Sequence, residues 1–90
     1  MSSPAAQRVV VISDKDPLGL HIRPAEQFVR LAMKFPCEIE VVRESVRADG
    51  KSIMQMMMLA AAQGSSLLIV CDGDDAQDAA AKLKALVESG

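Results

Sequence analysis

Hydrophobic positions divide the chain into seven segments, of which four have the pattern of β-strands. A β-branched run predicts a strand over residues 8–13, and alternation predicts a half-buried strand over residues 38–43, with Ile39 and Val41 on one face. After a turn at Glu44-Ser45, residues 46–48 are expected to form a short return strand. Residues 66–71, rich in Leu, Ile and Val, make the fourth predicted strand.

The other three segments have apolar residues spaced by three and four, which is typical of helices with one buried face. The first covers residues 22–35, and Pro36 is expected to end it because the residue before a proline resists the α-helical conformation. The second, residues 52–62, is short and very apolar. The third, residues 75–88, carries acidic residues in its first turn, where the helix dipole favours them.

The resulting order is β-α-β-β-α-β-α, without internal repeats or linkers. This order predicts an α+β protein, a two-layer sandwich in which helices cover one face of a four-stranded antiparallel or mixed sheet. A chain of 90 residues suffices for one domain with a modest core. We therefore expect a single domain over residues 1–90, with residues 1–7 as a loose leader.

Composition narrows the functional classes. Half of the residues are hydrophobic, Phe28 and Phe35 are the only aromatic residues, and the formal net charge is −2. This balance argues against nucleic acid as a partner, because nucleic-acid binding calls for a basic surface with stacking aromatics. The sequence has neither an apolar run of about 18 residues nor the pattern of a signal peptide. We therefore expect a cytoplasmic protein with no membrane insertion.

Cys37 and Cys71 each lie in an apolar stretch. Buried, reduced thiols are favoured over a disulfide in a cytoplasmic protein. The sequence has no cysteine and histidine spacing of the zinc type, and the aspartates between residues 72 and 78 lack the spacing of a calcium loop. No metal and no cofactor is therefore expected.

His21 is the single histidine, and it stands directly before the predicted helix of residues 22–35. Pro24 is tolerated in the first helical turn, whose free N–H groups and dipole attract anions. Arg23 adds a charged fork that suits phosphate oxygens. Neutral imidazole is a good nucleophile near pH 7. His21 followed by Arg23 and Pro24 therefore indicates a histidine that holds a transferable phosphoryl group. The alternative is a histidine that only caps the helix or lies at the surface.

Ser52 is expected to cap the second helix, because serine is a favoured N-cap residue and an apolar run follows it. Gly50-Lys51-Ser52 does not complete a nucleotide-binding loop, since the earlier glycine position of that motif holds Ser45. The alternative hypothesis is that Ser52 is a modification site, because the start of a helix tolerates a phosphate on its cap serine.

Four methionines of the second helix, Met54, Met56, Met57 and Met58, are the third candidate group. Helical spacing puts residues 54, 57 and 58 on one face and Met56 on another. Most of them either pack in the core or form an exposed patch, where flexible thioethers adapt to transient partners.

Two strings together make the chain resemble HPr, the histidine-containing phosphocarrier family of the bacterial phosphotransferase system. Residues 19–25, Gly-Leu-His-Ile-Arg-Pro-Ala, look like the active-centre string of that family, and residues 50–54, Gly-Lys-Ser-Ile-Met, look like its regulatory-serine string. The resemblance spans residues 8–88. It implies an open-faced β-sandwich, with three helices on one face of a four-stranded, mainly antiparallel sheet.

The resemblance also implies a reaction. His21 would accept a phosphoryl group on its δ1 nitrogen from enzyme I, which phosphoenolpyruvate charges, and would pass it to an enzyme IIA. Arg23 would steady the phosphate and Pro24 would shape the start of the helix. The chain would then be a carrier rather than an enzyme. Leu18 and Ile22 depart from the residues that many family members carry there, and Ile22 is expected to narrow access to the imidazole.

The same resemblance implies how partners dock. Leu20, Ile53, Met54 and Met57 would belong to the docking surface, and Ser52 would be a substrate of HPr kinase/phosphorylase. The alternative hypothesis is a regulatory or nitrogen-related member that binds a kinase or a transcription regulator through Ser52 and the methionines. A free-standing enzyme is disfavoured, because no second catalytic base accompanies the histidine. A monomer is expected, since nothing in the sequence demands an oligomer.

Overall fold

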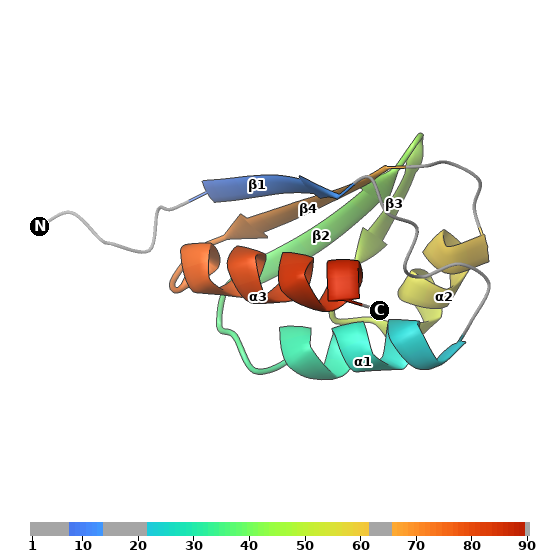
Figure 1. The fold of residues 1–90 in the computed structure, drawn as a ribbon, viewed down its shortest axis with the longest axis horizontal. Coiled ribbons are helices and arrows are strands. Elements are labelled where there is room, and N and C mark those ends of the chain that lie inside the picture. Colours follow the sequence, from blue (N-terminus) through green and yellow to red (C-terminus); the bar gives the residue numbers. More distant parts are fainter. Residues whose placement is uncertain (1–7, 14–21, 62–65, 90) are drawn as a thin grey trace, which may run out of the picture.

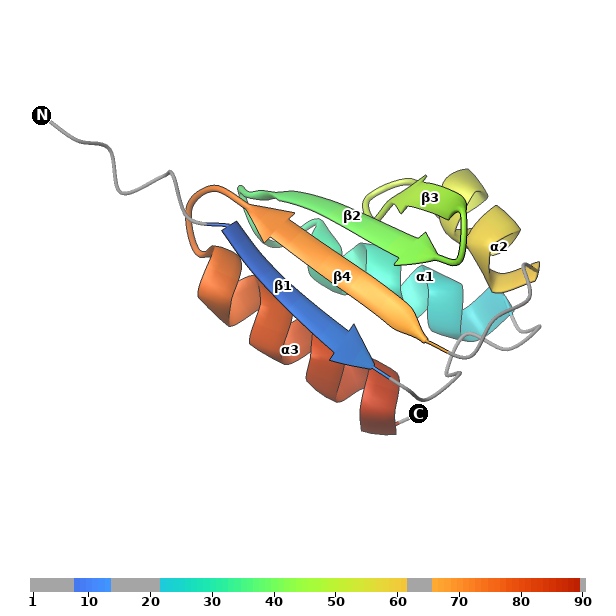
Figure 2. The same ribbon diagram turned by 90° about the horizontal axis from the view of Figure 1, so that it is seen from above.

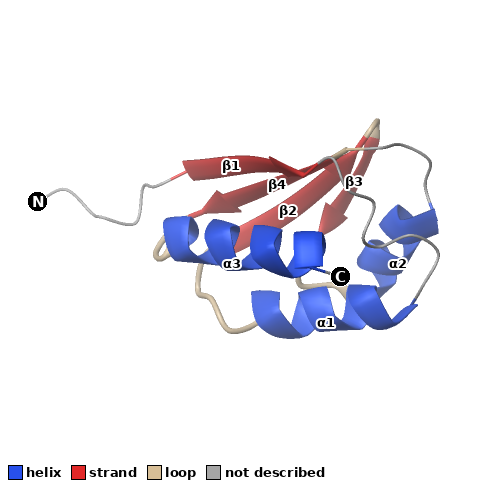
Figure 3. Cartoon of the chain, viewed as in Figure 1, coloured by secondary structure: helices blue, strands red, loops and turns tan. Residues whose placement is uncertain are grey.

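The computed structural model describes residues 8–13, 22–61 and 66–89, apart from the side chains of residues 22–24 and 89. The predicted leader, residues 1–7, lies outside these residues. Seven elements follow one another in the predicted order (Figures 1 and 3). They are β1 (Arg8–Ser13), α1 (Ile22–Ala32), β2 (Glu38–Arg43), β3 (Val46–Asp49), α2 (Ile53–Ala61), β4 (Leu67–Asp72) and α3 (Ala76–Ser89).

The four strands form one sheet in the order β1-β4-β2-β3. Each neighbouring pair is antiparallel, so the described sheet is fully antiparallel. β4 is a central strand: Cys71 faces Val9 of β1 on one side and Ile39 of β2 on the other. The two-residue turn between β2 and β3 is the predicted one, and its first residue, Glu44, has a φ of 54°. The fold class predicted from the sequence is therefore confirmed.

The three described helices lie on one side of the sheet, and no helix of the described residues covers the other side (Figures 1 and 2). α3 packs on β1 and β4, α2 packs on β3, and α1 packs on both other helices. Phe28 of α1, Leu59 of α2 and Leu83 of α3 meet Ile69 of β4 in the core. Val10 and Ile12 of β1 alternate with core-packed neighbours and remain exposed on the open face.

Helix α1 ends earlier than predicted. It stops at Ala32, whereas the apolar spacing had indicated a helix through Phe35. Lys34 and Phe35 instead donate their amides to the carbonyls of Leu31 and Ala32, over 3.0 and 3.2 Å, which tightens the last turn. The cause is Pro36, which disfavours the helical conformation at Phe35 and whose ring would clash with a helical carbonyl one turn earlier. Phe35 is buried nonetheless.

β1 and β2 have the predicted bounds, whereas several boundaries of the other elements shift by one residue. β3 extends to Asp49 because this residue still pairs with Glu40, and β4 extends to Asp72 because it pairs with Arg8. β4 and α3 begin at residues 67 and 76, one position later than predicted. Asp75, which precedes α3, has a φ of 63° and so stands outside the helix. The predicted final residue of α2, residue 62, lies outside the described residues.

Candidate functional site

The start of α1 is the first part of the candidate site. The helix begins at Ile22, so its free N–H groups and the positive end of its dipole lie directly after His21. His21 and Leu20 lie outside the described residues. Arg23 and Pro24 belong to the first turn by their backbone, but their side chains are likewise outside the description. The roles assigned to these four residues stay predictions.

Ser52 lies immediately before the first residue of α2, at the position of an N-cap. Its hydroxyl oxygen accepts a hydrogen bond from the backbone N–H of Gln55 over 3.3 Å. Its carbonyl accepts the N–H of Met56 over 2.9 Å, which is the first hydrogen bond of the helix. The hydroxyl is therefore engaged with the helix start and remains half-buried rather than enclosed.

The turn before Ser52 is tied to the helix by a second set of hydrogen bonds that the sequence analysis did not identify. The backbone N–H of Asp49 donates to the Gln55 side-chain oxygen over 2.7 Å. The Asp49 carboxylate accepts the N–H of Lys51 over 2.9 Å. A serine followed three residues later by glutamine is the sequence signature of a capping box, which could have pointed to Gln55. Here the glutamine reaches Asp49 instead of the cap residue itself.

Two contacts dock this turn on the body of the protein. The Lys51 ammonium donates to the carbonyl of Phe35 over 2.6 Å, and the Gly50 N–H donates to the carbonyl of Ile39 over 2.8 Å. Gly50 is required by close approach, because a Cβ at this position would lie 2.6 Å from Ile39 Cγ2 and 3.2 Å from the Phe28 ring. We call residues 49–52 the Ser52 turn.

The outer face of α2 carries exposed methionines. Met54, Met57 and Met58 are 74%, 38% and 67% exposed, whereas Met56 is fully buried. The prediction that Met56 points away from the other three is therefore confirmed, and the interpretation that most of them pack in the core is wrong. Ile53 is partly buried and packs against the core. We call Met54, Met57 and Met58 the methionine surface.

The two candidate parts lie at the same end of the molecule. α1 and α2 pack against each other, and Figures 1 and 2 both show the start of α1 beside α2. α2 contains no charged residue, so the methionine surface is an uncharged apolar patch close to the start of α1. This arrangement suits a site where an anion is held at a helix start and a partner docks beside it.

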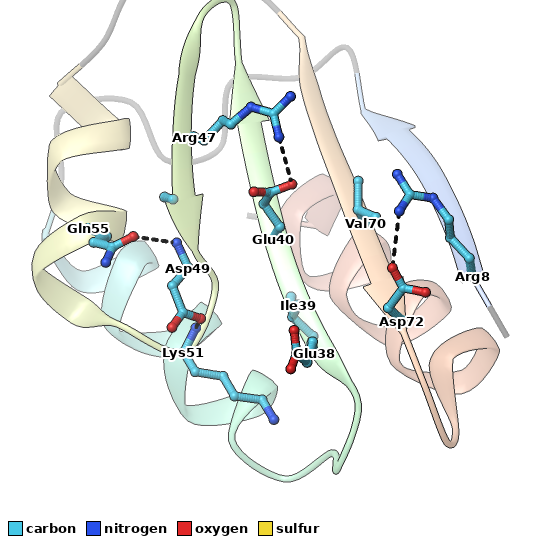
Figure 4. A pocket seen from close by; sticks show the side chains of 11 residues that line it. Arg8, Glu38, Ile39, Glu40, Arg47, Asp49, Lys51, Gln55, Val70 and Asp72 are labelled. Atoms are coloured by element: carbon cyan, nitrogen blue, oxygen red, sulfur yellow. Dashed lines mark hydrogen bonds and ion pairs between the residues drawn. The ribbon is translucent and has the colours of Figure 1, made fainter. Parts of the chain in front are cut away.

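A shallow depression on the open face of the sheet borders the Ser52 turn (Figure 4). Two ion pairs cross it, Arg8 to Asp72 over 3.1 Å and Arg47 to Glu40 over 3.4 Å. Both pairs are solvent-exposed, so they contribute little to stability and create no buried charge for catalysis. Within the described part of the chain, no three His, Cys, Asp or Glu residues are placed to hold a metal ion. None of the described helices is long and apolar enough to cross a membrane.

Comparison with known proteins agrees with this geometry. A family model described as the phosphorylation site of the HPr component of the phosphotransferase system matches residues 6–89. The phosphocarrier protein HPr of Pseudomonas aeruginosa is 46% identical over 72 residues, which are 79% of this chain and 77% of that protein.

Solved structures show the same likeness. A crystal structure of HPr from Thermoanaerobacter tengcongensis is similar with a TM-score of 0.75 and 37% identity, and 92% of each chain is covered. Crh, the catabolite repression protein of Bacillus subtilis, is similar with a TM-score of 0.70 and 35% identity, over 79% of this chain and 82% of that chain. The Crh structure is described as an intertwined dimer with a swapped domain.

Proposed function

Because this chain belongs to the family of HPr phosphocarrier proteins, we propose that His21 accepts a phosphoryl group from enzyme I and passes it to an enzyme IIA. The observation that carries the proposal is the position of the histidine. It directly precedes the first residue of α1, and the methionine surface lies close by on α2. The protein would thus be a carrier whose own chemistry is limited to one reversible phosphorylation.

The chemistry needs little besides this position. The neutral imidazole attacks the phosphorus atom of the donor, a P–N bond forms, and the donor's bond to phosphorus breaks. The phosphoryl oxygens then meet the free N–H groups of the first turn of α1 and, in our proposal, the guanidinium of Arg23. Pro24 has no N–H, so it removes no donor that the helix itself requires. The reverse steps deliver the group to the acceptor.

Docking is the task that we assign to the methionine surface together with Leu20 and Ile53. The exposed thioethers of Met54 and Met57 are flexible and uncharged, so one surface adapts in turn to a donor and to an acceptor. A carrier with two successive partners needs such a surface, because it must release each partner after transfer. The support for this assignment is the exposure of these residues beside the start of α1.

Transfer to His21 is tested by incubating the protein with phosphoenolpyruvate and enzyme I. Label that is stable to alkali and labile to acid is expected on the wild-type chain and absent from His21→Ala. Gln27→Ala is the matched control, because Gln27 is an exposed residue of α1 outside the docking surface. Equal labelling of the His21→Ala variant would refute the proposal.

We further propose that Ser52 is phosphorylated by HPr kinase/phosphorylase. The Ser52 hydroxyl is half-buried and serves the helix only as an acceptor, a role that phosphate oxygens can also fill. The added charge would stand beside the docking surface and hinder the approach of enzyme I. Incubation with ATP and such a kinase, followed by mass spectrometry, should locate the phosphate on Ser52. Phosphate on another residue, or none, would contradict this proposal.

A second candidate function is favoured by the position of Ser52 at the start of α2, the helix that carries the methionine surface. In this alternative the chain is a regulatory binding module, in which phosphorylated Ser52 recruits a transcription regulator and transfer at His21 is minor. Pull-down with and without phosphate on Ser52 separates the two functions. Retention of a regulator only by the phosphorylated form, together with weak labelling of His21, would favour the regulatory module.

A further inference from the structure

The methionines in the described residues fall into two groups by exposure. The methionine surface lies on the outer face of α2, and Met33, directly after α1, is 63% exposed. Met56, in the same helix as the methionine surface, has no exposed area and packs in the core. One short helix therefore presents the same kind of side chain to water on one face and to the core on the other.

An exposed methionine differs in its chemistry from the other large aliphatic side chains. Its thioether sulfur carries lone pairs, and an oxidant converts it into a polar sulfoxide that reductases convert back. Leucine at residues 54, 57 and 58 would cover α2 with a similar apolar area and would be inert to this reaction. Because α2 contains no charged residue, sulfoxides would turn an uncharged apolar surface into a polar one.

We propose that the methionine surface is a reversible oxidation site, at which hydrogen peroxide forms sulfoxides that hinder the docking of enzyme I. The sulfur of each methionine attacks one peroxide oxygen, the O–O bond breaks and an S–O bond forms. The hydroxide that leaves takes the proton of the transferred oxygen and becomes water, so the sulfur loses two electrons and the peroxide gains them. A methionine sulfoxide reductase reverses the step with two electrons from a pair of thiols, which become a disulfide while the oxygen leaves as water.

Oxidation at these positions changes the outer surface of α2 rather than its packing. The helix is held in the core by Met56, Leu59 and Ala60, which are buried. A partner that docks on the outer face must remove water from each sulfoxide oxygen, and a buried polar group without a hydrogen bond is costly. We therefore expect transfer from enzyme I to fall about tenfold or more. This consequence rests on the docking role proposed above, whereas the oxidation itself does not.

The buried sulfur atoms provide the contrast. An oxidant reaches Met56 only when α2 opens, and a sulfoxide there would place an unpaired oxygen in the core. Cys37 and Cys71 are buried free thiols, as predicted from the sequence. Among the described residues, peroxide therefore meets the methionine surface and Met33 before it meets these three side chains.

The first test locates the oxygen atoms. The full chain is treated briefly with hydrogen peroxide, and the sulfoxides are assigned by peptide mapping. Met54 and Met58 should react about as fast as Met33, which is similarly exposed, Met57 should react more slowly, and Met56 should remain a thioether. In concentrated urea all five should react alike, which separates protection by the fold from intrinsic reactivity. Oxidation of Met56 as fast as that of Met54 in the folded chain, or a much slower reaction of Met54 and Met58 than of Met33, would overturn the proposed site.

The second test measures docking. Each protein is treated with peroxide, the peroxide is removed with catalase, and the initial rate of phosphorylation by enzyme I and phosphoenolpyruvate is compared with the rate of the same protein before treatment. The wild type and the control variant Met33→Leu should both lose about tenfold or more, and methionine sulfoxide reductase should restore the rate. The variant that combines Met54→Leu, Met57→Leu and Met58→Leu should keep its own untreated rate.

The outcomes of the two tests are distinguishable. A loss in the triple leucine variant equal to that of the wild type would assign the damage to residues outside the methionine surface and would overturn the regulation. An unchanged rate in the oxidised wild type would overturn it as well. Absence of phosphorylation before any treatment would contradict the proposed phosphocarrier function and the regulation that rests on it, while the peptide map alone decides whether the methionine surface is an oxidation site.

Discussion

Helices α2 and α3 cover the same sheet, and the comparison between them separates folding from function. Each buries a stripe that reaches the common core, with Leu59 on α2 and Leu83 on α3. Their outer faces differ. α3 carries a surface ion pair, Lys82 to Asp78 over 3.3 Å, whereas the outer face of α2 carries the methionine surface and no charge.

This difference shows which features the fold requires. An ion pair such as that of α3 is common on a helix face that is exposed to water, because charged side chains are well solvated there. Large apolar side chains on the outside of α2 add no burial and expose hydrophobic area, so packing does not explain them. The methionine surface is therefore the part of the helix layer to which we assign the docking of partners.

The largest effect on stability is expected from substitutions on the inner faces of α2 and α3, where the two helices are alike. Leu59→Ala and Leu83→Ala should each lower the free energy of unfolding by about 2–5 kcal/mol, because each removes buried methyl groups and leaves a cavity. Urea denaturation measures the change. A loss well below this range for Leu59 alone would show that α2 is docked more loosely than α3.

Giving α2 the charged outer face of α3 should reduce phosphoryl transfer while leaving the stability of the fold nearly unchanged. Met54→Asp with Met58→Lys gives α2 the same spacing of charges that Asp78 and Lys82 have on α3. Transfer from enzyme I should fall about tenfold or more, because buried contacts of the interface are lost, while stability changes by less than about 0.5 kcal/mol. Steady-state phosphorylation and thermal unfolding measure the two quantities.

The control for this exchange is the reverse change on α3. Asp78→Met with Lys82→Met adds apolar surface outside the candidate site, so the rate of transfer should remain that of the wild type. Loss of transfer in this control variant would show that exposed charge anywhere on the helix layer matters, and the methionine surface would lose its special role.

The capping of α2 should give the next smaller effect. Ser52→Ala removes the acceptor of the Gln55 N–H and should cost about 1 kcal/mol of folding free energy. Ser52→Asp keeps an acceptor at the cap and places a negative charge at the positive end of the helix, so its stability should match the wild type. Thermal unfolding of the two variants distinguishes them. Equal destabilisation by both would show that the hydroxyl has a role other than capping.

The pattern of hydrophobic positions, together with the turn at Glu44-Ser45, predicted all seven elements and their order. The helices were identified by their apolar spacing, whereas the short strand after the turn was identified by its position. The pattern also predicted that Met56 points away from Met54, Met57 and Met58, since helical spacing alone determines shared faces. The early end of α1 was missed because Phe35 continues the apolar spacing, although the following proline excludes it from the helix.

The contacts of the Ser52 turn could not be predicted in the same way. Lys51 reaches the carbonyl of Phe35, which is 16 residues away, and Gly50 packs on Ile39. Such contacts depend on how separate elements meet in space, and no local pattern encodes them. The roles of His21 and Arg23 come from motif and family and await the labelling experiment.

The smallest effect is expected from the ion pair on the outer face of α3. Asp78 and Lys82 are one helical turn apart and solvent-exposed, so their coupling should be about 0.3–0.5 kcal/mol at low salt. A double-mutant cycle with Asp78→Asn and Lys82→Gln measures it, and the coupling should vanish near 1 M salt, where screening is nearly complete. Lys82 also lies 6.0 Å from the centre of the Phe35 ring. Lys82→Gln could still lower the free energy of unfolding when Asp78 is replaced by Asn and when the salt concentration is high. That result would show that Lys82 stabilises the protein through the Phe35 ring rather than through the ion pair.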